Sequence, residues 1–314
     1  MSHHVAVIGA GLIGRAWAIV FARAGFEVAL YDISPDALAK AGESIEAAAA
    51  DLAAAGLVAD TAFTTCIRRE PDLAAALAGV DYVQECGPET LTAKQALFAE
   101  LERAVTPDTI LGSSTSGILA SDFAAKLEHP ERCLVAHPVN PPYLIPLVEL
   151  VPAPATSAAV VERVRALMAD AGQVPITVRR EISGFVLNRL QGALLNEAMR
   201  LVGGGYVSAA DLDDTVKHGL GQRWSFMGPL ETIDLNAPGG IADYATRYGP
   251  LYAGMAETQA EAPDWGAAAM AELERARREL LAESELAARQ EWRDRRLMAL
   301  AVHKRDMQNI DPTG

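Results

Sequence analysis

The sequence predicts an α/β protein in which a mainly parallel, doubly wound sheet is followed by an all-α C-terminal part. Three observations support this prediction. Short β-branched segments alternate with alanine-rich helical segments up to about residue 185, which is the order that right-handed crossovers between parallel strands produce. A glycine-rich turn directly follows the first of these strands. Beyond residue 185 only helical periodicity remains.

The predicted strands are short apolar segments in the N-terminal part of the chain. They are enriched in Val, Ile, Leu and Tyr, as is typical of strands that a sheet buries. The segments between them mostly have the composition of helices. The predicted strands are Val5–Ile8, Val28–Tyr31, Tyr82–Gln84, Ile110–Gly112, Leu134–Ala136, Leu147–Val151 and Ile176–Val178.

The change near residue 185 predicts a first domain, residues 1–185, and a helical second domain, residues 186–314. In the second domain Gly and Pro residues are expected to interrupt the helices at Gly203–Gly205, at Gly219–Pro229 and across Pro238–Pro263. The last segment, Met270–Met307, mixes charges of both signs with a stripe of Leu and Trp. This pattern predicts a solvated helix packed through one apolar face, and a helix that contacts a second subunit is the alternative.

The composition excludes several classes of protein. The chain of 314 residues carries 41 Asp and Glu against 27 Lys and Arg, a formal charge of -14. Such an acidic chain lacks the clustered cations that binding to nucleic acid or to an anionic membrane requires. Charges or prolines interrupt each apolar stretch before it reaches the length of a membrane span. The expected partners are therefore small molecules or further copies of the chain.

The three cysteines, Cys66, Cys86 and Cys133, are widely spaced and odd in number. This spacing offers neither a disulfide framework nor a C-x-x-C metal site, so we expect reduced thiols and no metal. The first residues lead into the strand Val5–Ile8 without the basic and apolar regions of a signal peptide. The expected location is the cytoplasm.

The segment Gly9–Gly14, with the sequence GAGLIG, fits the G-x-G-x-x-G pattern of a dinucleotide-binding turn. The pattern alone is weak, and its position between a β-branched strand and a helix makes it informative. Gly9 permits the tight turn, Gly11 lets the backbone approach a diphosphate, and Gly14 lets the helix pack closely on the strand. The free N–H groups at the helix start would bind the diphosphate. The predicted cofactor-binding residues of this turn are Gly9, Gly11, Leu12, Ile13 and Gly14.

Asp32 ends the second predicted strand. Its carboxylate would accept hydrogen bonds from the ribose hydroxyls of an adenosine and would repel a 2′-phosphate, which favours NAD over NADP. The alternative is an Asp that only caps the helix beginning near Ser34 and Pro35.

Ser116, His137 and Glu149 form a second group of candidate residues. Ser116 and His137 each lie just beyond a predicted strand, the edge at which open α/β sheets bind ligands. Hydride transfer from a secondary alcohol needs a base for the hydroxyl proton, and histidine is the natural one near neutral pH. Glu149 could orient the imidazole if the proline-rich turn folds its strand back beside His137. A structural, hydrogen-bonded histidine is equally compatible with the spacing.

The segment Val135–Val151, with the sequence VAHPVNPPYLIPLVELV, closely resembles the lambda-crystallin and L-gulonate 3-dehydrogenase branch of the 3-hydroxyacyl-CoA dehydrogenase superfamily. The resemblance covers nearly the whole chain. Other matching segments are Gly14–Ala18, Gly184–Gln191, Gly228–Thr232, Trp292–Asp294 and Leu297–Met298. It implies a Rossmann-type domain that binds NAD, followed by an all-helical domain through which the chain forms a homodimer.

The resemblance also implies roles for individual residues. His137 would be the general acid/base and Glu149 its orienting partner, while Ser116 and Asn188 would hydrogen-bond the reacting oxygen. Asn188 lies within the predicted helix Phe185–Leu195, and a structural hydrogen bond on the helix surface is its alternative. Glu89 and Lys94 match positions in the cofactor cleft of the family; a solvated helix face is the alternative for Lys94.

The segment Ser44–Gly56 bears on the substrate. In the acyl-CoA branch of the superfamily, this helix carries basic and hydroxyl residues that hold the CoA phosphates. Here it is rich in Ala and acidic residues and contains no Lys or Arg. We therefore expect a free hydroxy acid, whose carboxylate a forked guanidinium would hold. Arg223, next to Trp224, is the candidate and Arg189 is the alternative.

The resulting hypothesis is NAD-dependent oxidation of the 3-hydroxyl of a small free 3-hydroxy acid, with L-gulonate as the preferred substrate. Two other enzymatic hypotheses are an enzyme like L-carnitine dehydrogenase and a short-chain 3-hydroxyacyl-CoA dehydrogenase or diketoreductase. A crystallin-like structural protein or an NAD sensor is the non-enzymatic alternative. The set Ser116, His137, Glu149 and Asn188 argues against that last alternative, because packing does not require such a polar group.

Overall fold

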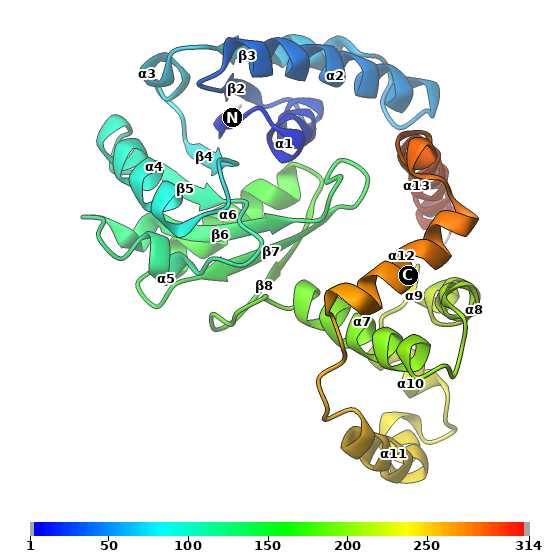
Figure 1. The fold of residues 1–314 in the computed structure, drawn as a ribbon. Helices are drawn as coiled ribbons and strands as arrows, with labels where there is room; N and C mark the ends of the chain where they lie inside the picture. Colours follow the sequence, from blue (N-terminus) through cyan, green and yellow to red (C-terminus); the bar gives the residue numbers. More distant parts are fainter. Residues whose placement is uncertain (1–2, 311–314) are drawn as a thin grey trace. The chain divides into compact units, whose positions relative to one another are not determined.

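The computed structural model describes residues 3–310 and contains one eight-stranded sheet with helices on both faces, followed by further helices (Figure 1). The chain forms two compact units. The first runs to Arg189 and also includes Arg293–Asn309, and the second comprises Leu190–Trp292. The predicted fold class, a mainly parallel sheet followed by helices, is confirmed.

The strands of the first unit lie in the order β3-β2-β1-β4-β5-β6-β7-β8. The chain begins near the middle of the sheet, winds outward through β2 and β3, and then returns to β4 on the other side of β1, which is a doubly wound topology. All neighbours are parallel except β6 and β7. The strands are β1 (His4–Ile8), β2 (Glu27–Tyr31), β3 (Ile67–Glu70), β4 (Tyr82–Glu85), β5 (Ile110–Ser113), β6 (Cys133–Pro138), β7 (Leu147–Pro152) and β8 (Val174–Thr177).

Every predicted strand is present, but β3 was not predicted. Its sequence is Ile-Arg-Arg-Glu, and it pairs only with β2, at the edge of the sheet. Charged edge strands protect a sheet from pairing with other chains. They therefore lack the apolar pattern on which strand prediction depends.

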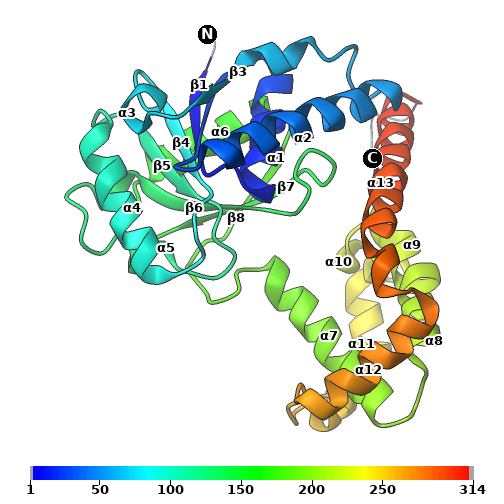
Figure 2. The same cartoon turned by 45° about the horizontal axis from the view of Figure 1, so that its top comes forward.

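Two apolar clusters cover the two faces of the sheet. Val5 and Val7 of β1 belong to one cluster and Ala6 and Ile8 to the other, as the two-residue period of a strand requires. Helices α1, α2 and α6 contribute to the first cluster, and α3, α4 and α5 to the second (Figure 2). These helices are α1 (Leu12–Arg23), α2 (Pro35–Ala54), α3 (Leu73–Ala76), α4 (Leu91–Ala104), α5 (Ala120–Phe123) and α6 (Ala158–Asp170), with 3₁₀ turns at Ala62–Cys66 and Pro130–Arg132.

The described residues after 185 contain helices and no strand. No helix in the described part of the chain is long and apolar enough to cross a membrane. The helices are α7 (Leu187–Gly203), α8 (Ala209–Thr215), α9 (Gly221–Trp224), α10 (Pro229–Leu235), α11 (Gly240–Thr258), α12 (Ala267–Leu280) and α13 (Leu286–Ile310), with a π-helical turn at Val216–Leu220 and a 3₁₀ turn at Glu283–Glu285.

Several predicted helix boundaries in this part are wrong. The stretch Pro238–Pro263 was expected to be interrupted, but α11 spans 19 residues of it and contains Pro250 in its interior. Gly249 precedes that proline and has no Cβ to clash with the ring, which reduces the usual barrier to helical backbone there. The helical turns after α8 also continue past Gly219 as far as Trp224.

The segment Met270–Met307 forms two helices rather than one. Leu281 has extended backbone and ends α12. The later residues of α13 pack on the first unit, where Met298 is buried in the cluster that contains α1 and α2. Arg305 donates a hydrogen bond of 2.5 Å to the carbonyl oxygen of Gly56, just beyond α2.

Candidate active site

The predicted site residues of the first unit lie at one edge of its sheet. β1 leads into Gly9, β2 into Asp32, β4 into the loop that contains Glu89, and β5 into the loop that contains Ser116, while His137 lies near the end of β6. Because these strands are parallel, their carboxyl ends lie at the same edge of the sheet. The five residues therefore lie at the edge where open α/β sheets bind ligands.

The antiparallel pairing of β6 and β7 places His137 directly opposite Glu149. Nδ1 of His137 is 2.8 Å from Oε2 of Glu149, and the two side chains are 8% and 0% exposed. The proline-rich turn therefore does fold the second strand back beside the histidine. A carboxylate at Nδ1 keeps the proton on that nitrogen, which leaves Nε2 free to accept a proton from a substrate hydroxyl.

The other oxygen of Glu149 caps the start of α7. Oε1 accepts hydrogen bonds of 2.9 Å from the N–H groups of both Val186 and Leu187, so the carboxylate lies at the positive end of the helix. Burial alone would raise the pKa of Glu149, but the hydrogen bonds from His137 and from these two N–H groups together lower it. The carboxylate is therefore ionised at neutral pH and stabilises an imidazolium when His137 takes up a proton.

Ser116 and Asn188 also lie together. Nδ2 of Asn188 donates a hydrogen bond of 2.7 Å to the backbone oxygen of Ser116, and Ser116 is exposed. The predicted helix Phe185–Leu195 in fact begins at Leu187, because Phe185 has a φ of 51° and lies in a turn. The N–H groups that directly follow this turn, those of Val186 and Leu187, are the ones that Glu149 binds.

Glu89 holds the Ser116 loop. Its Oε1 accepts hydrogen bonds from Thr115 Oγ1 at 2.6 Å, from Ser116 N at 2.8 Å and from Ser116 Oγ at 3.2 Å. Lys94 lies behind Glu89 rather than on a solvated helix face, since its side chain is 1% exposed and its Nζ is 3.3 Å from Glu89 Oε2. Its remaining contacts are with Glu85, a buried carboxylate that the sequence did not single out. Direct binding of a cofactor by Lys94 or Glu89 stays a prediction.

The glycine-rich turn has the shape that a dinucleotide needs. Gly9 has a φ of +106°, and a Cβ there would lie 2.6 Å from the carbonyl oxygen of Cys86; a Cβ on Gly14 would lie 1.7 Å from the carbonyl oxygen of Gly9. At Gly11 a Cβ would meet no atom within 4 Å, so the space beside the turn is open. No side chain caps the N-terminus of α1, and its N–H groups are available to a diphosphate. These residues fit NAD.

Asp32 ties the glycine-rich turn to the end of β2. Its Oδ2 accepts a hydrogen bond of 2.8 Å from Ala10 N, and its Oδ1 accepts one of 2.9 Å from Ser34 N. The cap of α2 is Ser34, whose Oγ accepts from Ala37 N, so capping does not account for Asp32. Each carboxylate oxygen retains a lone pair for a ribose hydroxyl.

Asn140 is a candidate that the sequence analysis missed. It follows β6 in the segment that begins with His137, and its Oδ1 is buried without a hydrogen-bond partner among the described residues. A buried acceptor without a donor is costly, so such an atom points to a ligand or an ordered water. The only signal in the sequence is its place three residues after His137.

Arg223 belongs to α9 of the second unit. Its charge acts on Tyr244. A hydrogen bond with Tyr252 is the main cause that raises the pKa of Tyr244, and the positive charge of Arg223 offsets part of that rise.

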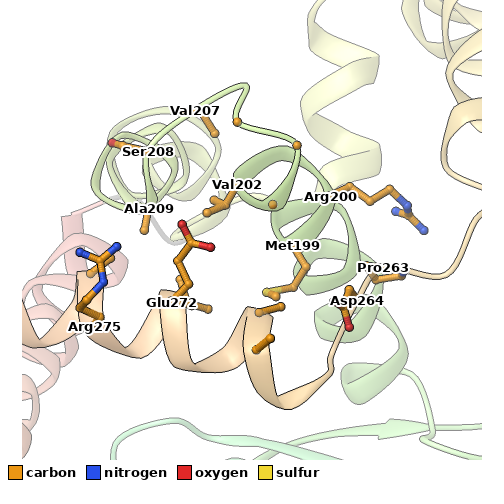
Figure 3. A pocket seen from close by; sticks show the side chains of 17 residues that line it. Met199, Arg200, Val202, Val207, Ser208, Ala209, Pro263, Asp264, Glu272 and Arg275 are labelled. Atoms are coloured by element: carbon orange, nitrogen blue, oxygen red, sulfur yellow. The ribbon is translucent and has the colours of Figure 1, made fainter.

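A cavity of about 800 Å³ elsewhere in this unit is lined by residues of α7, α8 and α12 (Figure 3), and none of the predicted site residues lines it. The choice between Arg223 and Arg189 as the carboxylate clamp stays a prediction.

A nucleotide-binding turn at the same sheet edge as a His–Glu pair defines a nicotinamide-dependent dehydrogenase that acts on hydroxyl groups. Residues 4–182 match the family model described as 3-hydroxyacyl-CoA dehydrogenase, NAD binding domain, and residues 184–276 match the model of the C-terminal domain of that family. The chain therefore belongs to the 3-hydroxyacyl-CoA dehydrogenase family, and it is an oxidoreductase that acts on CH–OH groups with NAD.

Three relatives illustrate the range of this family. The chain is 44% identical to lambda-crystallin of Oryctolagus cuniculus over 310 residues, which cover 97% of each chain. It is 38% identical to L-carnitine dehydrogenase of Streptomyces griseus, with 98% of this chain and 88% of that one covered. The solved structure of 5-formyl-3-hydroxy-2-methylpyridine 4-carboxylic acid 5-dehydrogenase, an NAD+ dependent dismutase, matches with a TM-score of 0.74 and 29% identity over 91% of this chain and 98% of that one.

Proposed function

We propose that the protein oxidises the 3-hydroxyl group of a small free 3-hydroxy acid, with L-gulonate as the first substrate to test. The observation that carries the proposal is the buried pair of His137 and Glu149, with Nδ1 and Oε2 separated by 2.8 Å. Glu149 holds the imidazole so that Nε2 takes the hydroxyl proton, and Ser116 and Asn188 hold the reacting oxygen. NAD, when bound, supplies the acceptor for the hydride that leaves C3.

The preference for a free acid rests on α2. A CoA nucleotide carries several phosphate charges, which lysines or arginines usually bind. The part of α2 from Ser44 to Ala54 contains acidic and alanine residues and no base. Nothing in that segment compensates the phosphates, so the carboxylate of a short acid is the better-matched anion, and Arg223 is the proposed clamp for it.

L-carnitine is the second candidate. Trimethylammonium groups bind to the faces of aromatic rings, and α11 carries three neighbouring tyrosines: the rings of Tyr244 and Tyr248 are 4.7 Å apart, and those of Tyr244 and Tyr252 are 6.3 Å apart. The similarity to an L-carnitine dehydrogenase supports testing this substrate as well.

Reduction of NAD, followed by absorbance of NADH, tests the proposal with L-gulonate, L-carnitine, 3-hydroxybutyrate and the CoA thioester of 3-hydroxybutyrate. We expect the highest kcat/KM with L-gulonate and a kcat lower by about 10²–10⁴-fold in the His137→Gln variant. Preference for the CoA thioester would refute the free-acid proposal, and preference for L-carnitine would select the second candidate. A wild-type protein that binds NADH but oxidises none of the four would favour the structural or NAD-sensing alternative.

We further propose that two copies associate through their second units. Of the described residues 190–292, only Thr232 and Ala237 are buried, although about 100 residues ordinarily form a substantial core. Large apolar side chains such as Phe226, Leu230 and Leu235 are more than 60% exposed, as is typical of a surface that another chain covers. Light scattering should give twice the 33.3 kDa mass of the chain, and a monomer at micromolar concentration would refute this proposal.

The cellular location is proposed to be the cytoplasm. Cys66, Cys86 and Cys133 are all free thiols, which suits a reducing compartment. Fractionation of the producing cells tests this, and recovery of the protein with secreted material would contradict it.

A further inference from the structure

Glu85, the last residue of β4, has a buried carboxylate whose contacts are all satisfied. Its side chain is 0% exposed. Oε1 accepts hydrogen bonds from Gly87 N at 2.6 Å and Lys94 Nζ at 3.1 Å, and Oε2 accepts from Ser113 Oγ at 2.5 Å and Lys94 Nζ at 2.9 Å. Donors on the strand end, on the next strand and on α4 therefore converge on a single carboxylate.

Lys94 extends this group to the candidate active site. Its ammonium has three hydrogens, and the neighbouring acceptors are the two oxygens of Glu85 and Oε2 of Glu89. Glu89 is 46% exposed and accepts from the backbone N–H and the hydroxyl of Ser116. The continuous series Glu85, Lys94, Glu89 and Ser116 thus joins a buried charge to the exposed hydroxyl that is predicted to hold the reacting oxygen.

We propose that Glu85 and Lys94 are positioning residues, which act through Glu89 to set the orientation of the Ser116 hydroxyl. The proposal rests on the function proposed above, in which Ser116 holds the reacting oxygen. Both side chains are at least 99% buried, so their effect on the substrate passes through Glu89 and not through direct contact.

The hydrogen of the Ser116 hydroxyl has two competing acceptors. A serine hydroxyl donates one hydrogen bond, so a hydrogen held by Glu89 is not available to the substrate oxygen. The contact from Ser116 Oγ to Glu89 is 3.2 Å, the longest of the three that reach this Glu89 oxygen. The ammonium of Lys94 attracts the negative charge of the Glu89 carboxylate, which makes that carboxylate a weaker acceptor for the hydroxyl of Ser116. Lys94 thereby helps to release the hydroxyl to the substrate.

Ionisable groups also lie on the elements around this series. Glu85 and Cys86 lie on or just after β4, Lys94 lies on α4, and His137 and Glu149 lie on β6 and β7. Burial raises the pKa of Cys86 to about 12, so the thiol does not titrate near neutrality. Burial would raise the pKa of Glu89, but hydrogen bonds from Thr115 and Ser116 and the charge of Lys94 lower it overall.

The experiment compares Lys94→Met, Lys94→Arg and the double variant Glu85→Gln/Lys94→Met with the wild type. Lys94→Met alone leaves the buried Glu85 carboxylate without its cation, which destabilises the protein whether or not Lys94 positions Glu89. The double variant removes both charges, so any loss of kcat that remains comes from the lost contact between Lys94 and Glu89. Arg132→Met is the matched control, because Arg132 is also a buried cation beside a glutamate, Glu102, and lies just before β6, at the opposite edge of the sheet. Each protein is measured for Tm, NADH affinity by fluorescence, and kcat and KM as functions of pH with the hydroxy acid that the wild type oxidises.

We expect Lys94→Met to lower kcat about tenfold or more, the effect of one misplaced hydrogen bond to the reacting atom. The acidic limb of the pH profile should move to higher pH because Glu89 loses a neighbouring cation, and the NADH affinity reports separately on the cofactor contact predicted for Lys94. Lys94→Arg should recover part of kcat. The double variant should regain Tm relative to Lys94→Met but keep the low kcat, and the control should lose stability without a change in the pH profile.

Two results would overturn the proposal while leaving the proposed function intact. If the double variant regains the kcat of the wild type, the pair is only structural. If Lys94→Met leaves both the kcat at saturating NAD and the pH profile unchanged, Lys94 does not act on Ser116, whatever its effect on NADH binding. A wild type inactive towards every acid would refute the proposed function and this inference together, which distinguishes that failure from the other two.

Discussion

Replacing Glu149 by Gln removes the charge beside His137 and nearly preserves the shape of the side chain. The N–H groups of Val186 and Leu187 can only donate, so the amide oxygen must face them. The amide nitrogen of the glutamine then faces Nδ1 of His137, at the position where Oε2 now lies 2.8 Å away. Because that nitrogen donates, Nδ1 must become an acceptor and the proton moves to Nε2. The imidazole then has no lone pair for the substrate hydroxyl.

The expected loss of kcat follows from this change of tautomer. An orienting carboxylate replaced by its amide costs about 10⁴-fold in kcat in the well-studied case of a catalytic triad, and we expect about 10³ to 10⁴-fold here. Three hydrogen bonds to a charged oxygen become bonds to a neutral amide, each weaker by about 0.5–1 kcal/mol. The free energy of unfolding should therefore fall by about 2 kcal/mol, which leaves a folded protein to assay.

The assay is the initial rate of NADH formation with the preferred acid, together with urea unfolding and NADH binding. Glu102→Gln is the matched control, since Glu102 also accepts hydrogen bonds from two backbone N–H groups, those of Glu128 and His129. It lies on α4 beside Arg132, just before the start of β6, whereas His137 lies near the end of that strand. We expect the control to retain kcat. If Glu149→Gln retains a kcat close to that of the wild type, Glu149 does not set the tautomer of His137, and the proposed mechanism is wrong.

The remaining predictions concern other parts of the site. His137→Gln should lower kcat by about 10²–10⁴-fold, the usual contribution of a general base, with little change in the Kd of NADH; normal turnover would remove His137 from the mechanism. Arg223→Leu should raise the KM for the acid by about tenfold or more, as expected for a lost bond to a charged group, and an unchanged KM would favour Arg189. Gly11→Ala should keep the Tm, because its Cβ meets open space, yet weaken NADH binding in calorimetry, whereas Gly14→Ala should lower both, since its Cβ would lie 1.7 Å from Gly9 O. The pKa values of Glu149 and Glu89 are lowered in the folded state, so their stabilisation is present above the unfolded pKa and is lost as pH falls through the folded one; Tm should fall from about pH 6 to about pH 3, and a Tm independent of pH would contradict this.

Much of the first unit could be predicted because its signals are local. A β-branched strand, a glycine-rich turn and an aspartate at the next strand end occur in short segments, and each strand predicted from composition is present. The edge strand β3 could not be predicted in this way. Its two arginines and one glutamate serve the solvated edge of the sheet and have no apolar period.

The site was harder to predict, because its less obvious residues depend on contacts across the sheet. Lys94 and Glu85 are nine residues apart, and nothing in their spacing shows that a lysine on a helix will be buried against the end of the preceding strand. The turn at Phe185 was also missed, since a positive φ is unusual for a residue other than glycine and the N–H groups that follow it bind Glu149, which is distant in the sequence. In both cases a buried carboxylate contacts a segment whose local structure propensity alone does not specify.

The antiparallel register of β6 and β7 has a consequence for how substrate range can change in this family of chains. His137 and Glu149 face each other because of the pairing of the two strands, whereas the segment between the strands, residues 139–146, has no part in that pairing. Substitutions or insertions in this connecting segment can alter what lies beside the histidine without separating it from its carboxylate. One residue inserted within either strand would turn one of the two side chains to the opposite face of the sheet. The connecting segment can therefore change the substrate that the proposed site accepts, while the paired strands keep the histidine and its carboxylate together for proton transfer.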